Sequence, residues 1–284
     1  MTTYPEIERM ARTMRRKILD ISHHCNLSTH LGGGLSMVEI MATLYARVLR
    51  YEPREPRWAQ RDRFILSKGH GVLGYFSALL AAGVIDEATF NTFQTNDSDL
   101  IAHPVMNADL GIESSNGSLG QGLSMAVGIA LAAKKRQRAH RTYVLLGDGE
   151  CNEGSVWEAA MSAAQLRLDN LAIAIDYNKL QSDGDSRQII DLGDLAARFR
   201  SFGWDVHEVD GHDVAQLVAA FEAPAVLGAP RAVVAHTVKG KGISFMENNN
   251  EWHHNRLTKA SYELALAELE AREPGVPEAA TAAL

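Results

Sequence analysis

The sequence has 284 residues, of which 46% are hydrophobic and 22% are charged, and its formal net charge is −7 at pH 7. This composition is typical of a globular protein and excludes disorder over most of the chain. The acidic balance argues against nucleic acid as the main partner, because binding phosphates requires clustered Lys and Arg side chains. Two cysteines, Cys25 and Cys151, are too few for a disulfide framework or a multi-cysteine metal site.

The N-terminal segment, Met1–Asp20, is charged and has a helical pattern rather than the continuous apolar stretch of a signal peptide. No segment approaches the roughly 20 apolar residues that are needed to span a bilayer. We therefore expect a cytoplasmic enzyme that has no membrane partner.

Apolar residues in the first half of the chain recur mainly at helical spacing. In chain order, the predicted elements are a helix over Met10–Ile21, a loop over His23–Gly34, a helix over Ser36–Leu49, a short apolar run over Arg63–Ser67, a helix over Val72–Ala82 and an irregular stretch over Gln94–Gly117. Long irregular stretches in compact domains are often functional.

The second half of the chain alternates helices with short apolar strands. The predicted helices are Gly120–Lys135, Ser155–Leu166 and Leu257–Ala271, and the predicted strands are Thr142–Leu146, Leu171–Asp176 and Arg231–Thr237. Strands that are apolar throughout and alternate with helices form parallel sheets covered on both faces. We therefore predict one α/β domain over residues 1–271, with a parallel sheet and helices on both faces, and a loose tail over residues 272–284.

The most informative motif is Gly147-Asp148-Gly149, which follows one predicted strand and precedes a helix. Glycines let the backbone approach a phosphate, and Asp148 can hold the hard cation that a diphosphate needs. The next strand ends before Asn178, whose side chain emerges beside Asp148 if the two strands are neighbours. Taken alone, the motif is also compatible with a tight turn, with Asn178 as a strand-end cap.

Four histidines lie in predicted loops beside glycine, proline or another turn: His30, His70, His103 and His253. Imidazole titrates near neutral pH, so it can move protons to and from hydroxyls or donate a hydrogen bond to phosphate. Surface positions and a zinc site are the alternatives for these residues. The zinc alternative is disfavoured because the histidines are not closely spaced and no cysteine pair accompanies them.

Together these motifs resemble a known family. Gly147-Asp148-Gly149, followed by Asn178 one helix and one strand later, is similar to the thiamine-diphosphate motif. The surrounding sequence resembles the N-terminal, diphosphate-binding half of transketolase from about residue 10 to residue 260. The matching stretches are Arg61–His70, Gly117–Leu123, Glu153–Ala159 and Thr237–Gly242.

The resemblance implies a thiamine-diphosphate-binding fold and a set of site residues. Asp148, Asn178 and the carbonyl of Leu180 would hold Mg²⁺ or Ca²⁺. The implied cofactor-binding residues are His70, Gly149, Asn178, Lys239 and His253 near the diphosphate, and the backbone of Gly117, Ser118 and Leu119 at the aminopyrimidine. The implied catalytic residues, which act on sugar hydroxyls, are His30, His103 and His253. His254 directly follows His253, so the two could exchange roles.

The resemblance also implies a reaction and a partner. Transketolases transfer a two-carbon glycolaldehyde unit from a ketose phosphate to an aldose phosphate, and their pyrimidine-binding domain supplies the glutamate that activates the cofactor. No segment after residue 260 resembles that domain. We therefore expect an active site shared with a separate C-terminal transketolase subunit that carries the pyrimidine-binding domain, in an α2β2 complex, with sugar phosphates as substrates.

Three other functions stay open at this point. Two are other thiamine-diphosphate enzymes, namely a deoxyxylulose-phosphate synthase-like protein and the α subunit of a 2-oxoacid dehydrogenase. The Gly117–Leu123 stretch and His103 beside Pro104 favour transketolase over both. The third is a non-catalytic structural subunit, which would not need the histidines or the Asp148–Asn178 pair.

Overall fold

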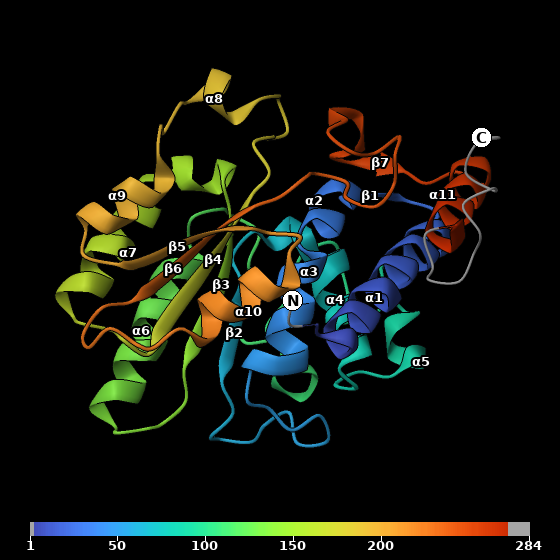
Figure 1. Cartoon of the computed structure of the whole chain (residues 1–284). Coiled ribbons are helices and arrows are strands. Elements are labelled where there is room, and N and C mark those ends of the chain that lie inside the picture. Colours follow the sequence, from blue (N-terminus) through green and yellow to red (C-terminus); the bar gives the residue numbers. More distant parts are fainter. Residues whose placement is uncertain (1–2, 272–284) are drawn as a thin grey trace.

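A five-stranded sheet forms the centre of the computed structural model, which describes residues 3–271 (Figure 1). Its strands, in spatial order, are β2 (Arg63–Leu66), β3 (Thr142–Gly147), β4 (Leu171–Tyr177), β6 (Arg231–His236) and β5 (Asp205–Asp210). Every pairing in this sheet is parallel, so all five strands end at the same edge. The predicted α/β class with a parallel sheet is confirmed.

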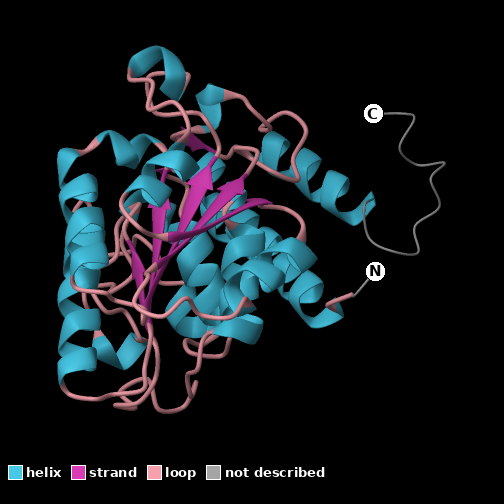
Figure 2. Cartoon of the chain, turned by 60° about the vertical axis from the view of Figure 1, so that its left-hand side comes forward, coloured by secondary structure: helices cyan, strands magenta, loops and turns pink. Residues whose placement is uncertain are grey.

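Side chains of the central strands alternate between two hydrophobic cores. In β3, Tyr143 and Leu145 pack into one core, whereas Val144 and Leu146 pack into the other. The first core is covered by α1 (Pro5–His24), α2 (Leu31–Ser36), α3 (Val38–Thr43), α4 (Val72–Ala81) and α10 (Val214–Glu222), and the second by α6 (Gly122–Lys135), α7 (Gly154–Gln165) and α9 (Leu195–Ser201). Figure 2 shows the strands enclosed between these two helical layers, as predicted.

The remaining elements are short, except for the last helix. They are α5 (Glu87–Phe90), α8 (Ser186–Ile189), α11 (Lys259–Ala271), the π-helical turn η1 (Leu44–Val48) and the 3₁₀ turns η2 (Gly69–Gly71), η3 (Ala108–Leu110), η4 (Gly149–Asn152) and η5 (Asn250–Trp252). Within residues 3–271, none of the helices combines the length and the apolar character that crossing a membrane requires. The predicted tail, residues 272–284, lies outside the described residues.

Two predictions near the N-terminus are wrong. The predicted loop over His23–Gly34 ends in helix α2, whose residues are all buried. Its glycines allow close packing, because a Cβ at Gly34 would lie 3.0 Å from the Cβ of Leu73 on α4. The single predicted helix over Ser36–Leu49 is interrupted at Met37, where the backbone leaves helical geometry with a ψ of 3°, and its last part is the π-helical turn η1, which follows α3 directly.

A small ribbon joins distant parts of the chain (Figure 1). Strand β1 (Ser28–Thr29) pairs antiparallel with β7 (Asn255–Arg256). This pairing places the residue after β1, His30, close to the residue before β7, His254. The ribbon therefore brings two sequence-distant histidines to the same place.

Candidate active site

The Gly147-Asp148-Gly149 motif lies at the carboxyl edge of the parallel sheet. Gly147 of β3 pairs with Asp176 of β4, so Asp148 follows a strand adjacent to β4. This confirms that the two strands are neighbours. The Oδ2 atom of Asp148 accepts a hydrogen bond from the backbone N–H of Lys179 at 2.7 Å, which joins the two strand ends directly. This edge is where ligands bind in open α/β sheets.

A cavity of about 280 Å³ opens at this edge. The predicted site residues that line it are His30, His70, His103, Gly117, Leu119, Asp148, Gly149, Asn178, Leu180, Lys239 and His253. Ser118 is exposed and is not among the lining residues. Lys68, Glu150 and Gln181 also line the cavity, although the sequence did not single them out.

Three oxygen-bearing groups in the cavity suit a hard cation: the carboxylate of Asp148, the side-chain amide of Asn178 and the carbonyl of Leu180. The Leu180 carbonyl accepts a hydrogen bond from the Lys239 ammonium at 3.1 Å, so a positive group already lies against it. Within residues 3–271, no three His, Cys, Asp or Glu side chains are arranged to hold a metal ion. The donor set that fits a cation here is therefore mixed, with amide and carbonyl oxygens beside one carboxylate.

Asp148 is buried with little compensation for its negative charge. The pKa of its carboxyl is raised to about 6, mainly by burial and then by the nearby Asp176 carboxylate, while backbone N–H groups and Lys68 offset only part of the effect. A divalent cation would favour the ionised form of this carboxyl. The electrostatics of Asp148, like the donor set, fit a bound cation.

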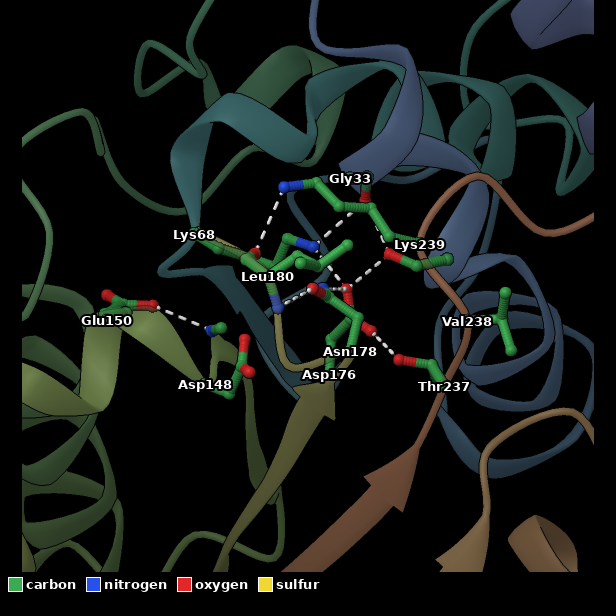
Figure 3. A network of polar contacts seen from close by, with 12 residues as sticks. Gly33, Lys68, Asp148, Glu150, Asp176, Asn178, Leu180, Thr237, Val238 and Lys239 are labelled. Atoms are coloured by element: carbon green, nitrogen blue, oxygen red, sulfur yellow. Dashed lines mark hydrogen bonds and ion pairs between the residues drawn. The ribbon is translucent and has the colours of Figure 1, made fainter. Parts of the chain in front are cut away.

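Asp176 is the centre of a buried polar network that the sequence analysis missed (Figure 3). Its carboxylate accepts hydrogen bonds from Ser36 Oγ at 2.6 Å, Lys68 Nζ at 2.5 Å, Asn178 Nδ2 at 3.3 Å and the hydroxyl of Thr237. Burial alone would raise the pKa of Asp176, but Lys68 and these hydrogen bonds outweigh it, and the pKa lies below its usual value. The network therefore fixes the ends of β4 and β6. The sequence signal that could have revealed this network was a charged residue, Asp176, at the end of an apolar strand.

Glu150 is a second buried carboxylate that the sequence analysis missed. It accepts hydrogen bonds from Ser67 Oγ at 2.5 Å, from Gly120 N at 2.8 Å and from Gly147 N at 3.1 Å. These donors belong to three separate segments that border the cavity. Burial raises the pKa of Glu150, and its three hydrogen-bond donors oppose this effect.

Five histidines form a cluster at the cavity: His30, His70, His103, His253 and His254. The ring of His30 is central, with centroid distances of 5.3 Å to His70, 6.1 Å to His103, 5.4 Å to His253 and 4.5 Å to His254. The cluster therefore gathers side chains from four separate segments. Of the two adjacent histidines, His253 lines the cavity and His254 does not.

Burial keeps His30, His70, His103 and His253 neutral. The pKa of His30 is lowered to about 3, mainly by burial and then by His254 and His253, and the pKa of His253 is lowered to about 4, mainly by burial and then by Lys239. The pKa of His70 lies well below its usual value, and that of His103 is also lowered, in both cases mainly by burial. A neutral imidazole has one N–H donor and one acceptor nitrogen, so each ring can give or accept a hydrogen bond.

Lys239 connects the histidine cluster to the proposed cation donors. Its ammonium lies 2.7 Å from Nδ1 of His253, 3.1 Å from the Leu180 carbonyl and 3.3 Å from the Gln181 carbonyl. Burial, together with the nearby Lys68, lowers the pKa of Lys239 to about 8, so it is still mostly charged at pH 7. Because the ammonium donates to Nδ1, the proton of neutral His253 is assigned to Nε2.

The family model for "Transketolase, thiamine diphosphate binding domain" matches residues 7–273. The chain belongs to this transketolase family. The match covers nearly all of the described residues, which agrees with a cavity whose donors suit a diphosphate and its cation.

Several transketolase relatives have almost the same length. An "Apulose-4-phosphate transketolase" subunit from Actinobacillus succinogenes is 45% identical over 267 residues, which are 94% of this chain and 97% of the relative. "6-deoxy-6-sulfo-D-fructose transketolase subunit SqwG" from a Clostridium species is 42% identical over 85% of this chain and 88% of the relative. The predictions of the transketolase family and of a transketolase-type transferase are confirmed.

Solved transketolase structures share the fold. The enzyme from Campylobacter jejuni superposes with a TM-score of 0.87 and 28% identity, covering 98% of this chain but 45% of the solved chain. The enzyme from Leishmania mexicana gives a TM-score of 0.86 and 29% identity, covering 95% of this chain and 42% of the solved chain. The chain thus spans less than half the length of these transketolases.

Proposed function

We propose that this chain is the cofactor-binding subunit of a two-subunit transketolase. The complex transfers a two-carbon ketol unit from a ketose phosphate to an aldose phosphate, and it uses thiamine diphosphate and Mg²⁺ or Ca²⁺. The observation that carries the proposal is one cavity that combines cation-type oxygen donors with a cluster of neutral histidines. When bound, thiamine diphosphate supplies the carbon nucleophile that carries the two-carbon unit.

In this proposal the strand ends bind the metal and the diphosphate. Asp148, Asn178 and the carbonyl of Leu180 hold the cation, and the Lys239 ammonium moves from that carbonyl to a phosphate oxygen. Gly149 contributes its backbone N–H. Support for this role comes from close packing, because a Cβ at Gly149 would lie 2.6 Å from Cγ of Gln181.

Two further segments complete the proposed cofactor site. His70 and His253 offer imidazole hydrogen bonds to the diphosphate, and both rings line the cavity. The backbone from Gly117 to Leu119 contacts the aminopyrimidine. Gly117 leaves this backbone uncovered beside His103, whose ring atoms would lie 3.7 Å from an added Cβ.

His30, His103 and His253 handle the substrate protons in this proposal. Because each imidazole is neutral at pH 7, its acceptor nitrogen can take a proton from a donor hydroxyl and return it to the acceptor sugar. For His253 this nitrogen is Nδ1, which becomes available when the Lys239 ammonium moves to a phosphate oxygen. Their proximity supports shared action on one substrate, since the rings of His103 and His253 each lie near that of His30.

The proposed partner is a separate chain with a pyrimidine-binding domain, in an α2β2 complex. Two observations support it: relatives of the same length carry "subunit" in their names, and the solved transketolases are more than twice as long. An active site at the contact between two chains also accounts for a cofactor cavity that opens at the sheet edge.

Substrate choice follows from the relatives by analogy. Their names specify apulose-4-phosphate and 6-deoxy-6-sulfo-D-fructose, so we propose a sugar-catabolic ketose with a terminal anionic group as the donor. A panel of these two ketoses and the common pentose and hexose phosphates, each with an aldose phosphate acceptor, would identify the donor.

The deciding experiment compares the purified chain alone with the chain plus its partner subunit in a ketol-transfer assay. We expect turnover only in the presence of both chains, thiamine diphosphate and Mg²⁺. Turnover by this chain alone would contradict the shared site. Decarboxylation of pyruvate without ketol transfer would support another thiamine-diphosphate enzyme, and absence of metal-dependent cofactor binding in the complex would support a purely structural role.

A further inference from the structure

The backbone on either side of Lys239 is held from outside the cofactor cavity. On one side, the backbone N–H of Val238 donates to Nε2 of His212 at 2.8 Å. On the other side, the carbonyl of Lys241 accepts a hydrogen bond from Nε of Arg15 at 3.2 Å. Neither Arg15 nor His212 lines the cofactor cavity. The two contacts therefore constrain the backbone around Lys239 through residues that do not line the cavity.

One buried carboxylate binds both of these side chains. Oε1 of Glu39, on α3, lies 2.5 Å from Nη2 of Arg15, and its Oε2 lies 2.9 Å from Nδ1 of His212. Because Nε2 of His212 accepts the Val238 N–H, that nitrogen carries no proton, and the ring proton lies on Nδ1 and points to Glu39. The carboxylate therefore also fixes the tautomer of His212.

Two further observations indicate that this arrangement is tightly specified. Burial by itself would raise the pKa of Glu39, but Arg15 and His212 outweigh it, and the pKa lies below its usual value. Gly242 has a φ of +103°, and a Cβ there would lie 2.9 Å from Nε of Arg15. Only glycine allows the chain to turn here while Arg15 approaches this closely.

We propose that Glu39 is a positioning residue for Lys239, and that it acts through two arms, His212 to Val238 and Arg15 to Lys241. This inference rests on the proposed function for the role of Lys239 at the diphosphate. Glu39 itself does not line the cavity, and neither do Arg15 and His212, which its carboxylate contacts. It sets the loop geometry from which the ammonium reaches the diphosphate.

The test uses Glu39→Gln in the full chain, because an amide can satisfy only one arm. If its oxygen faces Arg15, its NH₂ group faces His212 and forces the ring proton onto Nε2, against the Val238 N–H. If the amide is reversed, the NH₂ group opposes Arg15 instead. Glu39→Asp, which keeps the charge, is the conservative variant and should restore part of the effect.

The matched control is Asp205→Asn. Asp205 forms a largely buried ion pair with Arg231 at 2.9 Å, at the start of β5 and away from the Lys239 loop. This variant should cost a comparable amount of stability without disturbing the loop. It separates a positioning role from a general loss of folding free energy.

Two readouts need no substrate. In Glu39→Gln we expect faster hydrogen exchange at the Val238 amide and an altered tautomer signature of His212 in nitrogen NMR, and neither change in Asp205→Asn. Equal exchange in the two variants with an unchanged His212 signature would overturn the proposal.

The third readout is the affinity for thiamine diphosphate with Mg²⁺, measured by calorimetry on the complex. We expect Glu39→Gln to weaken it about tenfold, the size of one lost hydrogen bond to the loop, and Asp205→Asn to leave it unchanged. Equal weakening in both variants would overturn the positioning role. If the unaltered complex fails to bind the cofactor, the proposed function is wrong, and the exchange and NMR data alone decide the role of Glu39.

Discussion

The two sides of the cavity are built differently. The cavity floor, formed by Asp148, Asn178, Leu180 and Lys239, comes from the ends of strands and carries charges of both signs. The histidine cluster comes from four separate segments outside the main sheet, and the four rings that line the cavity, those of His30, His70, His103 and His253, are neutral. In the proposed function this difference corresponds to a division of work, in which the floor binds the cation and the diphosphate, with hydrogen bonds from His70 and His253, and the cluster moves protons.

The two carboxylates at neighbouring strand ends show the same contrast within the floor. Asp176 is compensated by Lys68 and by three other donors, and its pKa is lowered. Asp148 lacks such compensation, and its pKa is raised to about 6. We infer that the Asp176 carboxylate stabilises the fold, whereas the Asp148 carboxylate is the one proposed to bind a ligand. The predictions below test these two contrasts.

The largest effect is expected for Asp176→Asn. This change leaves the Lys68 ammonium buried without its counter-charge, which costs about 3–5 kcal/mol of unfolding free energy. Urea denaturation of the isolated chain measures it. Asp148→Asn is the matched control and should change stability by less than about 1 kcal/mol, since the amide oxygen can still accept from Lys179 N. Similar losses in both variants would remove the contrast between the two carboxylates.

The second prediction concerns the cluster. His30→Gln removes the central ring, so kcat of the complex should fall by about 100-fold or more, the range for loss of a general acid–base group. Thiamine diphosphate affinity should change by less than about threefold, because His30 is not among the residues proposed to bind the diphosphate. A loss of affinity as large as the loss of kcat would show that the two sides do not divide the work.

The third prediction is the reverse of the second: a change in the floor should lower cofactor affinity. Asp148→Asn replaces the one carboxylate in the proposed donor set, so Mg²⁺-dependent binding of thiamine diphosphate should weaken by at least about 10- to 100-fold. Calorimetry with and without Mg²⁺ measures it, and removal of the metal by a chelator should reproduce the effect in the unaltered protein. Equal cofactor affinity with and without metal would exclude this donor set.

The smallest effect is a change in pH dependence. With pKa values of about 3 and 4, His30 and His253 stay neutral well below pH 6.5 in the chain without cofactor. Protonation then favours the unfolded chain, so their contribution to stability is complete above about pH 6.5 and is lost as the pH falls toward 4. NMR titration of the two imidazoles measures their pKa values, which a bound diphosphate should raise because it is an anion. Ordinary titration near pH 6.5 without cofactor would contradict the burial of the cluster.

The central strands were predictable because they are apolar throughout. The predicted strands over Thr142–Leu146 and Leu171–Asp176 agree with β3 and β4 to within one residue at their C-terminal ends. Strand β5 was missed because it is an edge strand with acidic and histidine side chains, most of them partly exposed, and so has no continuous apolar run.

The site was predictable where single residues carry their own chemical signal. Glycines at a strand end and histidines in loops pointed to phosphate and proton chemistry, and the resemblance to transketolase added Leu180, Lys239 and the Gly117–Leu119 backbone. The predicted set, Ser118 apart, lines one cavity. The Asp176–Lys68 pair and the Glu39 contacts were not predictable. Their partners come from segments far apart in the chain, and each residue taken alone resembles an ordinary charged side chain.

The ribbon of β1 and β7 has a consequence for the order of assembly. It closes the longest loop among the strand pairings, since one strand lies near the start of the described chain and the other near its end. Closing a loop over such a separation has a large entropic cost and is therefore slow. Pairings of this kind form after those between nearer strands. We therefore expect the cavity floor at the sheet edge to form first during folding. The histidine cluster is then completed only when β1 and β7 pair.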